Sequence, residues 1–151
     1  MIYLEFFENK TIDSDIYISC LKKMKKEIEE KRGSDSKIRL LHDNAKPHTS
    51  KKTKKSIEEL RIKIIKHPPY SPDLAPSDYY LFPRLKDNIR GKRFKNKELL
   101  EEEVIKWLNN QPKSFFSDGI RKLEERWKLC ISNKGEYFEK NKKKRKKKDL
   151  N

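Results

Sequence analysis

Residues 40–50 have the sequence LLHDNAKPHTS, in which a short apolar run gives way to His42, Asp43 and Asn44. The apolar residues from 37 to 42 predict a strand, and Asp43 lies just past its carboxyl end. In open α/β sheets, functional groups gather outside the carboxyl ends of the strands. Asp43 therefore occupies the position where such a fold would bind a ligand.

The segments around this stretch alternate between strand and helix patterns. We expect strands at residues 2–7, 37–42 and 62–65, the first because it is rich in aromatic and β-branched residues. Cap residues and apolar spacing predict helices from about 14 to 32 and from about 50 to 60. Strands separated by crossover helices pair in parallel. The order therefore predicts an α/β fold with helices packed on the faces of a sheet.

A proline-rich loop follows the last predicted strand. Residues 67–77, HPPYSPDLAPS, contain four prolines and predict an ordered loop that is not helical. Ser77 is expected to cap a helix whose first turn holds Asp78, and Pro83 must bend or restart that helix. Two further amphipathic helices are predicted at residues 97–109 and 118–131.

The charge balance favours a polyanionic partner. The chain has 151 residues, enough for one domain, and a formal net charge of +15, for which nucleic acid is the commonest partner. Drift towards A/T-rich codons would also enrich lysine, so that alternative stays open. No apolar run approaches 18 residues, and we expect no membrane span. Almost half of the net charge comes from one run of seven cations: Lys142, Lys143, Lys144, Arg145, Lys146, Lys147 and Lys148.

This basic run predicts a solvated, disordered tail over residues 140–151. Such runs bind phosphates without recognising sequence, and they also serve as nuclear import signals. We therefore expect the tail to bind nucleic acid and the protein to be nuclear.

Asp43 and Asp78 are the candidate metal ligands, with 34 residues between them. One follows a strand and the other opens a helix after the adjacent strand, so the two can converge at one sheet edge. Paired carboxylates suit Mg²⁺, and two such ions about 4 Å apart promote phosphoryl transfer. Either aspartate could instead be a helix or loop cap, and Asp73 is an alternative partner. His42 and His48 fit orienting or phosphate-contacting roles, or plain polar loop positions, better than metal ligation.

Two long motifs resemble the signature blocks of mariner-family transposases. LLHDNAKPHTS (residues 40–50) resembles the family pattern HDNAxPH, and HPPYSPDLAPSDYYLFPRLK (67–86) resembles YSPDLAPSDYxLF. The flanking segments at residues 3–32, 91–94 and 119–139 agree. The resemblance extends over about residues 1–139, nearly the whole chain outside the basic tail.

The resemblance implies an RNase H-like fold whose carboxylates bind two Mg²⁺ or Mn²⁺ ions and cut and rejoin transposon ends. Asp43 and Asp78 match the second and third catalytic aspartates of the family, and His42, Asn44 and His48 would shape the site. The implied partner is transposon-end DNA, and the resemblance also allows a homodimer.

One departure from the family pattern limits this expectation. The first catalytic aspartate of the family lies on an earlier strand, and no part of this sequence matches it or the family's helix-turn-helix domains. We therefore expect residues 1–139 to form an N-terminally truncated RNase H-like domain with extra C-terminal helices, inactive alone. The alternative is a catalytically dead remnant that only binds nucleic acid. Fusions of a mariner transposase to a SET domain share this half, but nothing here resembles a SET domain.

Overall fold

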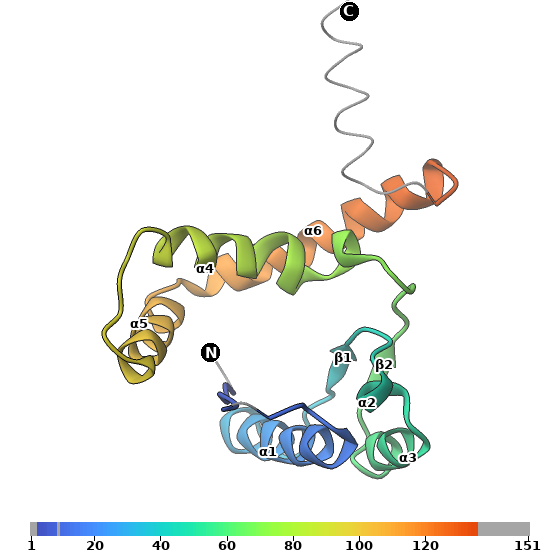
Figure 1. Cartoon of the computed structure of the whole chain (residues 1–151). Helices are drawn as coiled ribbons and strands as arrows, with labels where there is room; N and C mark the ends of the chain where they lie inside the picture. The colour runs from blue at the N-terminus through green and yellow to red at the C-terminus, as the bar shows by residue number, and fades with distance from the viewer. Residues whose placement is uncertain (1–2, 9, 136–151) are drawn as a thin grey trace, which may run out of the picture. The chain divides into compact units, whose positions relative to one another are not determined.

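The computed structural model describes residues 3–8 and 10–135, and the chain divides into two compact units between Pro69 and Tyr70 (Figure 1). The first unit contains α1 (Ser14–Arg32), β1 (Arg39–Leu41), α2 (Lys46–Thr49), α3 (Lys51–Glu59) and β2 (Lys63–Ile65). The second contains the 3₁₀ helix η1 (Pro72–Leu74), the π-helix η2 (Ser77–Leu81), α4 (Phe82–Ile89), α5 (Lys97–Asn109) and α6 (Lys113–Ser132). The predicted basic tail lies outside the described residues.

A small parallel sheet organises the first unit. β1 and β2 pair in parallel with Leu40 opposite Ile64, which confirms the predicted pairing. Both strands are three residues long, so β1 is shorter than the predicted strand at 37–42. Helices α1 and α3 lie side by side against the sheet (Figure 1). The carboxyl ends of both strands therefore open on the same edge.

The core of the first unit is apolar and compact. Leu21 of α1, Ile57 of α3 and Ile62 before β2 are buried together. Partly buried side chains pack around them: Tyr17, Met24, Ile38, Leu40, Leu60 and Ile64. Burying such side chains stabilises the fold by about 1.5–3 kcal/mol each, so this cluster fixes the helices against the sheet.

Local capping explains where α1 and α3 begin. The Asp13 side chain accepts a hydrogen bond from the backbone N–H of Ile16 at 2.9 Å, and α1 begins at Ser14. The Ser50 hydroxyl accepts from the N–H of Thr53 at 3.1 Å, so Ser50 caps α3 as predicted. Each cap satisfies an N–H group that the helix leaves without a partner.

The strand predicted at residues 2–7 is wrong for the residues that the structure describes. Residues 3–7 have no regular secondary structure, while Met1 and Ile2 lie outside the described part. A strand forms only when a neighbouring strand takes its backbone hydrogen bonds, and in the described sheet β1 pairs with β2 alone. The segment instead contacts α1 through Glu5, whose carboxylate binds the Lys23 ammonium at 2.6 Å.

The second unit begins with the proline-rich loop and a helix of changing pitch. Ser77 was expected to be an N-cap, but the helix already includes it, because the N–H groups of Asp78 and Tyr79 both bond to the Ala75 carbonyl. The first turn has π geometry, with the Phe82 N–H bonded to the Ser77 carbonyl. Pro83 then lies in the first turn of α4, where its missing N–H is tolerated, and the helix changes from π to α geometry there, in line with the prediction that Pro83 bends or restarts it.

A close contact between η2 and α6 organises the second unit. A Cβ added to Gly119 of α6 would lie 2.7 Å from the Tyr80 ring, so only glycine allows this approach. The Tyr79 hydroxyl donates to the Gly119 carbonyl at 2.7 Å, and the Arg126 guanidinium donates to the Asp73 carbonyl at 2.8 Å. These bonds tie the segment that carries Asp78 to α6.

The remaining helices differ little from expectation. α5 has the predicted bounds, whereas α6 begins at Lys113 rather than at residue 118. The extra turn contains Phe115, whose ring packs on Tyr80 with a centroid distance of 5.0 Å. Within the described residues, no helix combines the length and the apolar character that a membrane crossing requires.

Candidate functional site

Asp43 lies two residues past β1, at the carboxyl end of the sheet, as predicted. Its Oδ1 atom accepts hydrogen bonds from the Ala45 backbone N–H at 3.1 Å and from His48 Nδ1 at 2.7 Å. Both hydrogen bonds are to Oδ1 rather than to Oδ2, and the Asp43 side chain is 65% exposed. One carboxylate oxygen is therefore held in place, and the other is open to a ligand.

A stack of three rings lies behind this carboxylate. The rings of His42 and His48 are 5.1 Å apart and nearly parallel, with an interplanar angle of 10°. The Tyr17 ring lies 4.1 Å from the His48 ring, and its hydroxyl is 2.6 Å from His42 Nδ1. The stack joins α1 to the strand end and to α2, because His48 belongs to α2.

The hydrogen bonds and burial of this cluster set its protonation. The Ala45 N–H, and after it the His48 ring, hold the pKa of Asp43 below its usual range, so this carboxyl is ionised at neutral pH. Burial and the neighbouring His48 lower the pKa of His42. Burial, with a smaller effect of the Asp43 charge, raises the pKa of Tyr17 to about 12. Tyr17 is therefore a protonated hydroxyl at neutral pH.

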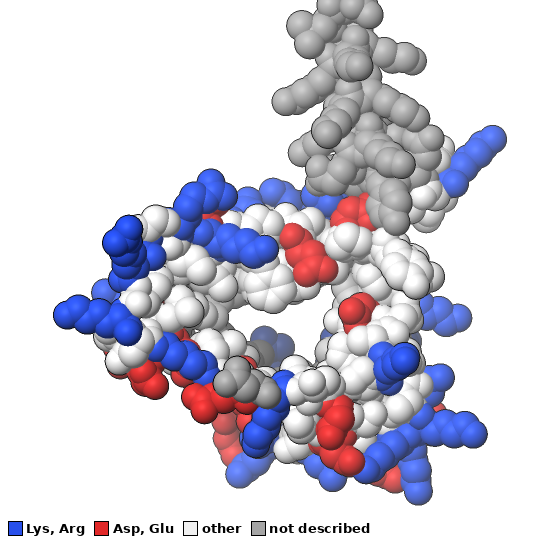
Figure 2. All heavy atoms as spheres, viewed as in Figure 1, with Lys and Arg blue, Asp and Glu red and all other residues white. Residues whose placement is uncertain are grey.

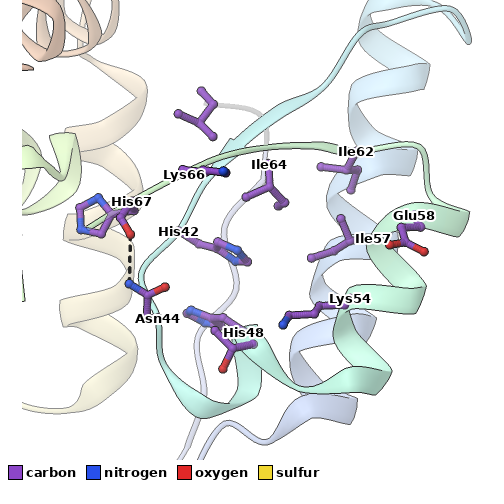
Figure 3. A pocket seen from close by; sticks show the side chains of 12 residues that line it. His42, Asn44, His48, Lys54, Ile57, Glu58, Ile62, Ile64, Lys66 and His67 are labelled. Carbon is purple, nitrogen blue, oxygen red and sulfur yellow. Dashed lines mark hydrogen bonds between the residues drawn. The ribbon is translucent and has the colours of Figure 1, made fainter. Parts of the chain in front are cut away.

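Asn44 links the two strand ends. Its side-chain amide donates to the His67 carbonyl at 3.1 Å, and this bond crosses from the end of β1 to the end of β2 (Figure 3). The bond gives Asn44 an observed role in positioning the loop that carries Asp43. In the sequence, Asn44 was expected only to help shape the site.

A cavity of about 640 Å³ opens beside these residues (Figure 3). Its apolar wall includes Ile57, Ile62 and Ile64, and its polar side includes His42, His48 and Lys54. An apolar wall with a few polar groups is the usual character of a ligand pocket. The pocket belongs wholly to the first unit and lies at the same strand ends as Asp43.

Asp78 belongs to the second unit, in the first turn of the π-helix η2. The side chain is exposed, and its Oδ1 atom accepts a hydrogen bond from the Ser77 hydroxyl at 3.3 Å. Because Asp43 and Asp78 lie in different units, their approach to one metal ion stays a prediction. Asp73, the alternative partner, is buried, with 7% of its surface exposed. The exposed carboxylate of Asp78 is therefore more accessible to a metal ion than that of Asp73.

The residues present fit a divalent metal in their chemistry. Asp43 offers an ionised carboxylate oxygen beside open solvent, which is the ligand type that Mg²⁺ and Mn²⁺ prefer. Across residues 3–8 and 10–135, no three His, Cys, Asp or Glu side chains gather closely enough to hold a metal by themselves. Asp43 is therefore a candidate for one ligand, and the described part of the first unit holds no complete metal site.

Basic side chains cover much of the visible surface (Figure 2). On α1 they are largely balanced by acidic residues, as in the Lys25–Glu29 and Lys31–Glu27 ion pairs. The first two turns of α3 instead hold four exposed lysines: Lys51, Lys52, Lys54 and Lys55. This lysine-rich part of α3 follows directly after α2, which carries His48.

Tyr17 is the site residue that the sequence did not reveal. It is spaced four and seven residues before Leu21 and Met24 on α1, as a core residue of a helix would be, and it does pack against that core. A half-buried tyrosine hydroxyl must still find a hydrogen-bond partner, but the sequence alone cannot identify His42 as that partner.

Comparison with known proteins agrees with the sequence motifs. Residues 3–101 match the family model described as DDE superfamily endonuclease. The human histone-lysine N-methyltransferase SETMAR is 40% identical over 100 residues, covering 66% of this chain and 15% of that protein. The mariner Mos1 transposase of Drosophila mauritiana is 33% identical over 144 residues, covering 92% of this chain and 42% of that protein. The chain therefore spans less than half the length of each of these relatives.

Solved structures show the same relationship in three dimensions. The Mos1 transposase catalytic domain, solved with Raltegravir and Mg, matches with a TM-score of 0.86 and 32% identity. The match covers 91% of this chain and 71% of that one. A Mos1 paired-end complex with the left transposon end matches with a TM-score of 0.85 and 33% identity, covering 91% of this chain and 41% of that one. Sequence and fold agree that the chain belongs to the DDE superfamily endonucleases, as a homologue of the mariner transposases.

Proposed function

We propose that this chain provides Asp43 and Asp78 as metal ligands of a mariner-type site for DNA strand cleavage and transfer. The observation that carries the proposal is the geometry of Asp43, whose ionised carboxylate is fixed through Oδ1 and exposed at the carboxyl end of β1. Membership of the DDE superfamily supports the reaction class. The Mos1 catalytic domain was solved with Mg and with Mn, which supports a divalent metal.

The residues of this chain would divide the work between holding a metal and holding DNA. A bound Mg²⁺ or Mn²⁺ supplies positive charge that stabilises the oxygens of the reacting phosphate. Asp43 would present Oδ2 to the ion while Ala45 and His48 keep Oδ1 in place. Asn44 keeps the Asp43 loop against the end of β2. Asp78 would contribute the second carboxylate.

The lysines at the start of α3 are suited to the DNA backbone. Lys51 and Lys54 are exposed and form no ion pair with another described residue, so their charges are available to phosphates. Each phosphate neutralised by a lysine releases counterions, which favours binding at low salt. Mos1 transposase has been solved in complex with a left transposon end, which supports DNA as the partner.

We propose further that this chain is inactive alone, as an RNase H-like domain that lacks the first carboxylate of the family pattern. Purified chain, incubated with transposon-end DNA and Mg²⁺, should release little or no cleaved strand. Two carboxylates leave the metals under-coordinated, and this removes several kcal/mol of transition-state stabilisation. Robust nicking that disappears in Asp43→Asn would contradict the expected inactivity.

The second candidate function is a catalytically dead remnant that only binds nucleic acid. The observation favouring it is the basic character of the chain, with a net charge of +15. Mn²⁺ titration followed by electron paramagnetic resonance separates the two candidates. A mariner-type metal site predicts that Asp43→Asn weakens Mn²⁺ binding about tenfold or more, as loss of a direct ligand should. The remnant predicts the same weak Mn²⁺ binding in both proteins, with DNA affinity retained.

A further inference from the structure

Tyr17 makes two contacts beyond those that core packing requires. On one side of α1 the residue packs with Leu21 and Met24 around the core of the first unit. Its hydroxyl lies 2.6 Å from His42 Nδ1, and its ring lies 4.1 Å from the His48 ring. A phenylalanine would fill the same volume, so the hydroxyl is the part of Tyr17 that packing does not explain.

The chemistry of the partners constrains the directions of the hydrogen bonds in this cluster. An ionised carboxylate only accepts, so His48 Nδ1 carries a proton and donates it to Asp43 Oδ1 at 2.7 Å. The Tyr17 hydroxyl lies 2.6 Å from His42 Nδ1 and can donate to it, which would leave the proton of a neutral His42 ring on Nε2. With the hydroxyl as donor, Tyr17 would select one of the two tautomers of His42.

The two histidines form one rigid surface behind Asp43. Their rings are stacked with a centroid distance of 5.1 Å and an interplanar angle of 10°, so each ring packs against the other. Tyr17 contacts both, through its hydroxyl at His42 and through its ring at His48. Outer groups that fix the orientation of a metal-binding side chain often change metal affinity by about 10- to 100-fold.

We propose that Tyr17 is a positioning residue for Asp43, acting through the stacked rings of His42 and His48. The inference rests on the proposed function, because it assigns Tyr17 to the same carboxylate that is proposed to bind the metal. The hydroxyl fixes His42, the stacked pair fixes the plane of the His48 ring, and His48 holds Asp43 Oδ1. Oδ2 is then presented to the metal in a single orientation.

The test compares two tyrosine-to-phenylalanine variants of the full chain. Tyr17→Phe removes the hydroxyl and keeps the ring. Tyr3→Phe is the matched control, because it also removes a tyrosine hydroxyl from the first unit. The Tyr3 hydroxyl bonds to Glu5, and Tyr3 takes no part in the ring stack. Long-range ¹H–¹⁵N NMR of the histidine rings reports the tautomer, and Mn²⁺ titration reports the metal affinity.

The wild-type chain should show His42 as the Nε2–H tautomer, and Tyr17→Phe should convert it to a mixture of both tautomers. The Mn²⁺ affinity should fall about three- to tenfold in Tyr17→Phe, near the lower end of outer-group effects, and stay within twofold in Tyr3→Phe. These results together would support the positioning role, because loss of packing alone would not change the tautomer.

Three results would overturn the inference. The first is a wild-type His42 that carries its proton on Nδ1, a measurement that needs no variant to fold. The second is an unchanged Mn²⁺ affinity in Tyr17→Phe when Asp43→Asn weakens it, which would leave the proposed function intact. The third is an unchanged affinity in both Tyr17→Phe and Asp43→Asn, which would remove the proposed function together with the inference.

Discussion

Asp43 combines exposure with restraint, two properties that rarely occur together in a surface carboxylate. Exposed side chains normally sample several rotamers, and fixing one costs conformational entropy. Here the Ala45 N–H and the His48 ring both bond to Oδ1, so the rotamer is fixed during folding rather than when a metal binds. Preorganisation of this kind strengthens binding by lowering its entropic cost.

The alkaline titration of Tyr17 tests the buried side of the same cluster. Burial raises the pKa of Tyr17 to about 12, against about 10 in an unfolded chain. The neutral hydroxyl is favoured in the folded state, so its contribution to stability is complete below pH 10 and is lost as the pH rises through 12. Absorbance at the tyrosinate band should therefore show one fewer late-titrating tyrosine in Tyr17→Phe than in wild type, while Tyr3 and Tyr79, whose pKa values are also raised by burial, are common to both proteins.

Unfolding measurements should agree with that titration. The difference in free energy of unfolding between wild type and Tyr17→Phe should shrink as the pH rises from about 10 to about 12, because ionised Tyr17 no longer stabilises the fold. The lysines also titrate in this range, but they are common to both proteins. A difference that stays constant over this pH range would contradict a buried Tyr17 hydroxyl.

At the scale of helices and strands, the sequence predicted elements whose signals are local. The helix capped by Ser50 and the helix at Lys97–Asn109 were found as expected, because caps and apolar spacing lie within the helices themselves. The strand at residues 2–7 was not found, because a strand depends on a partner that lies elsewhere. α2 was not predicted, because it is only four residues long and shows no apolar periodicity.

The candidate site divides in the same way between local and non-local information. Asp43 could be placed at a strand end because the apolar run before it is local, and the structure agrees. The Asn44 bond to His67 and the Tyr17 bond to His42 join residues 23 and 25 positions apart. No periodicity in the sequence predicts such pairs, so these roles needed the three-dimensional structure.

Gly119→Ala tests the contact between η2 and α6. In a free helix this change would stabilise by about 1 kcal/mol, since alanine has the higher helix propensity. Here the added Cβ would lie 2.7 Å from the Tyr80 ring, and overpacking of this kind costs about 1–3 kcal/mol. We therefore expect Gly119→Ala to lower the midpoint of thermal unfolding.

A second background separates the clash from other effects of the same substitution. In a Tyr80→Leu chain the ring is absent, so adding Gly119→Ala should be neutral or stabilising there. Equal destabilisation in both backgrounds would mean that the Tyr80 ring is not what the new methyl group meets.

For the molecule as a whole, charge outside the described residues should control DNA affinity. The run of seven cations at residues 142–148 is expected to contact about five to seven phosphates, and each contact contributes a slope of about −0.9 in log affinity against log salt. Deleting residues 140–151 should flatten that slope by several units and leave sequence preference unchanged. Asp43→Asn is the control, and it should barely alter the slope. An unaltered slope after the deletion would favour codon drift as the origin of the tail.

The same tail is proposed to direct nuclear import. A fluorescent fusion of the full chain should accumulate in the nucleus, and replacing the seven cations at residues 142–148 by glutamine should redistribute it. Import is an effect of the charged run rather than of Asp43, so Asp43→Asn should leave the distribution unchanged. A fusion protein that still accumulates in the nucleus after the glutamine replacement would contradict this role.

The central claim is that Asp43 and Asp78 bind one metal site together, and paramagnetic relaxation by Mn²⁺ tests it most directly. Broadening falls steeply with distance from the ion, so the residues nearest the metal lose their amide signals first as Mn²⁺ is added. We predict that the signals of residues 43 and 78 broaden together, and that Asp43→Asn or Asp78→Asn alone strongly reduces the broadening at both. Broadening at residue 43 that persists in Asp78→Asn, with residue 78 unaffected in wild type, would contradict it.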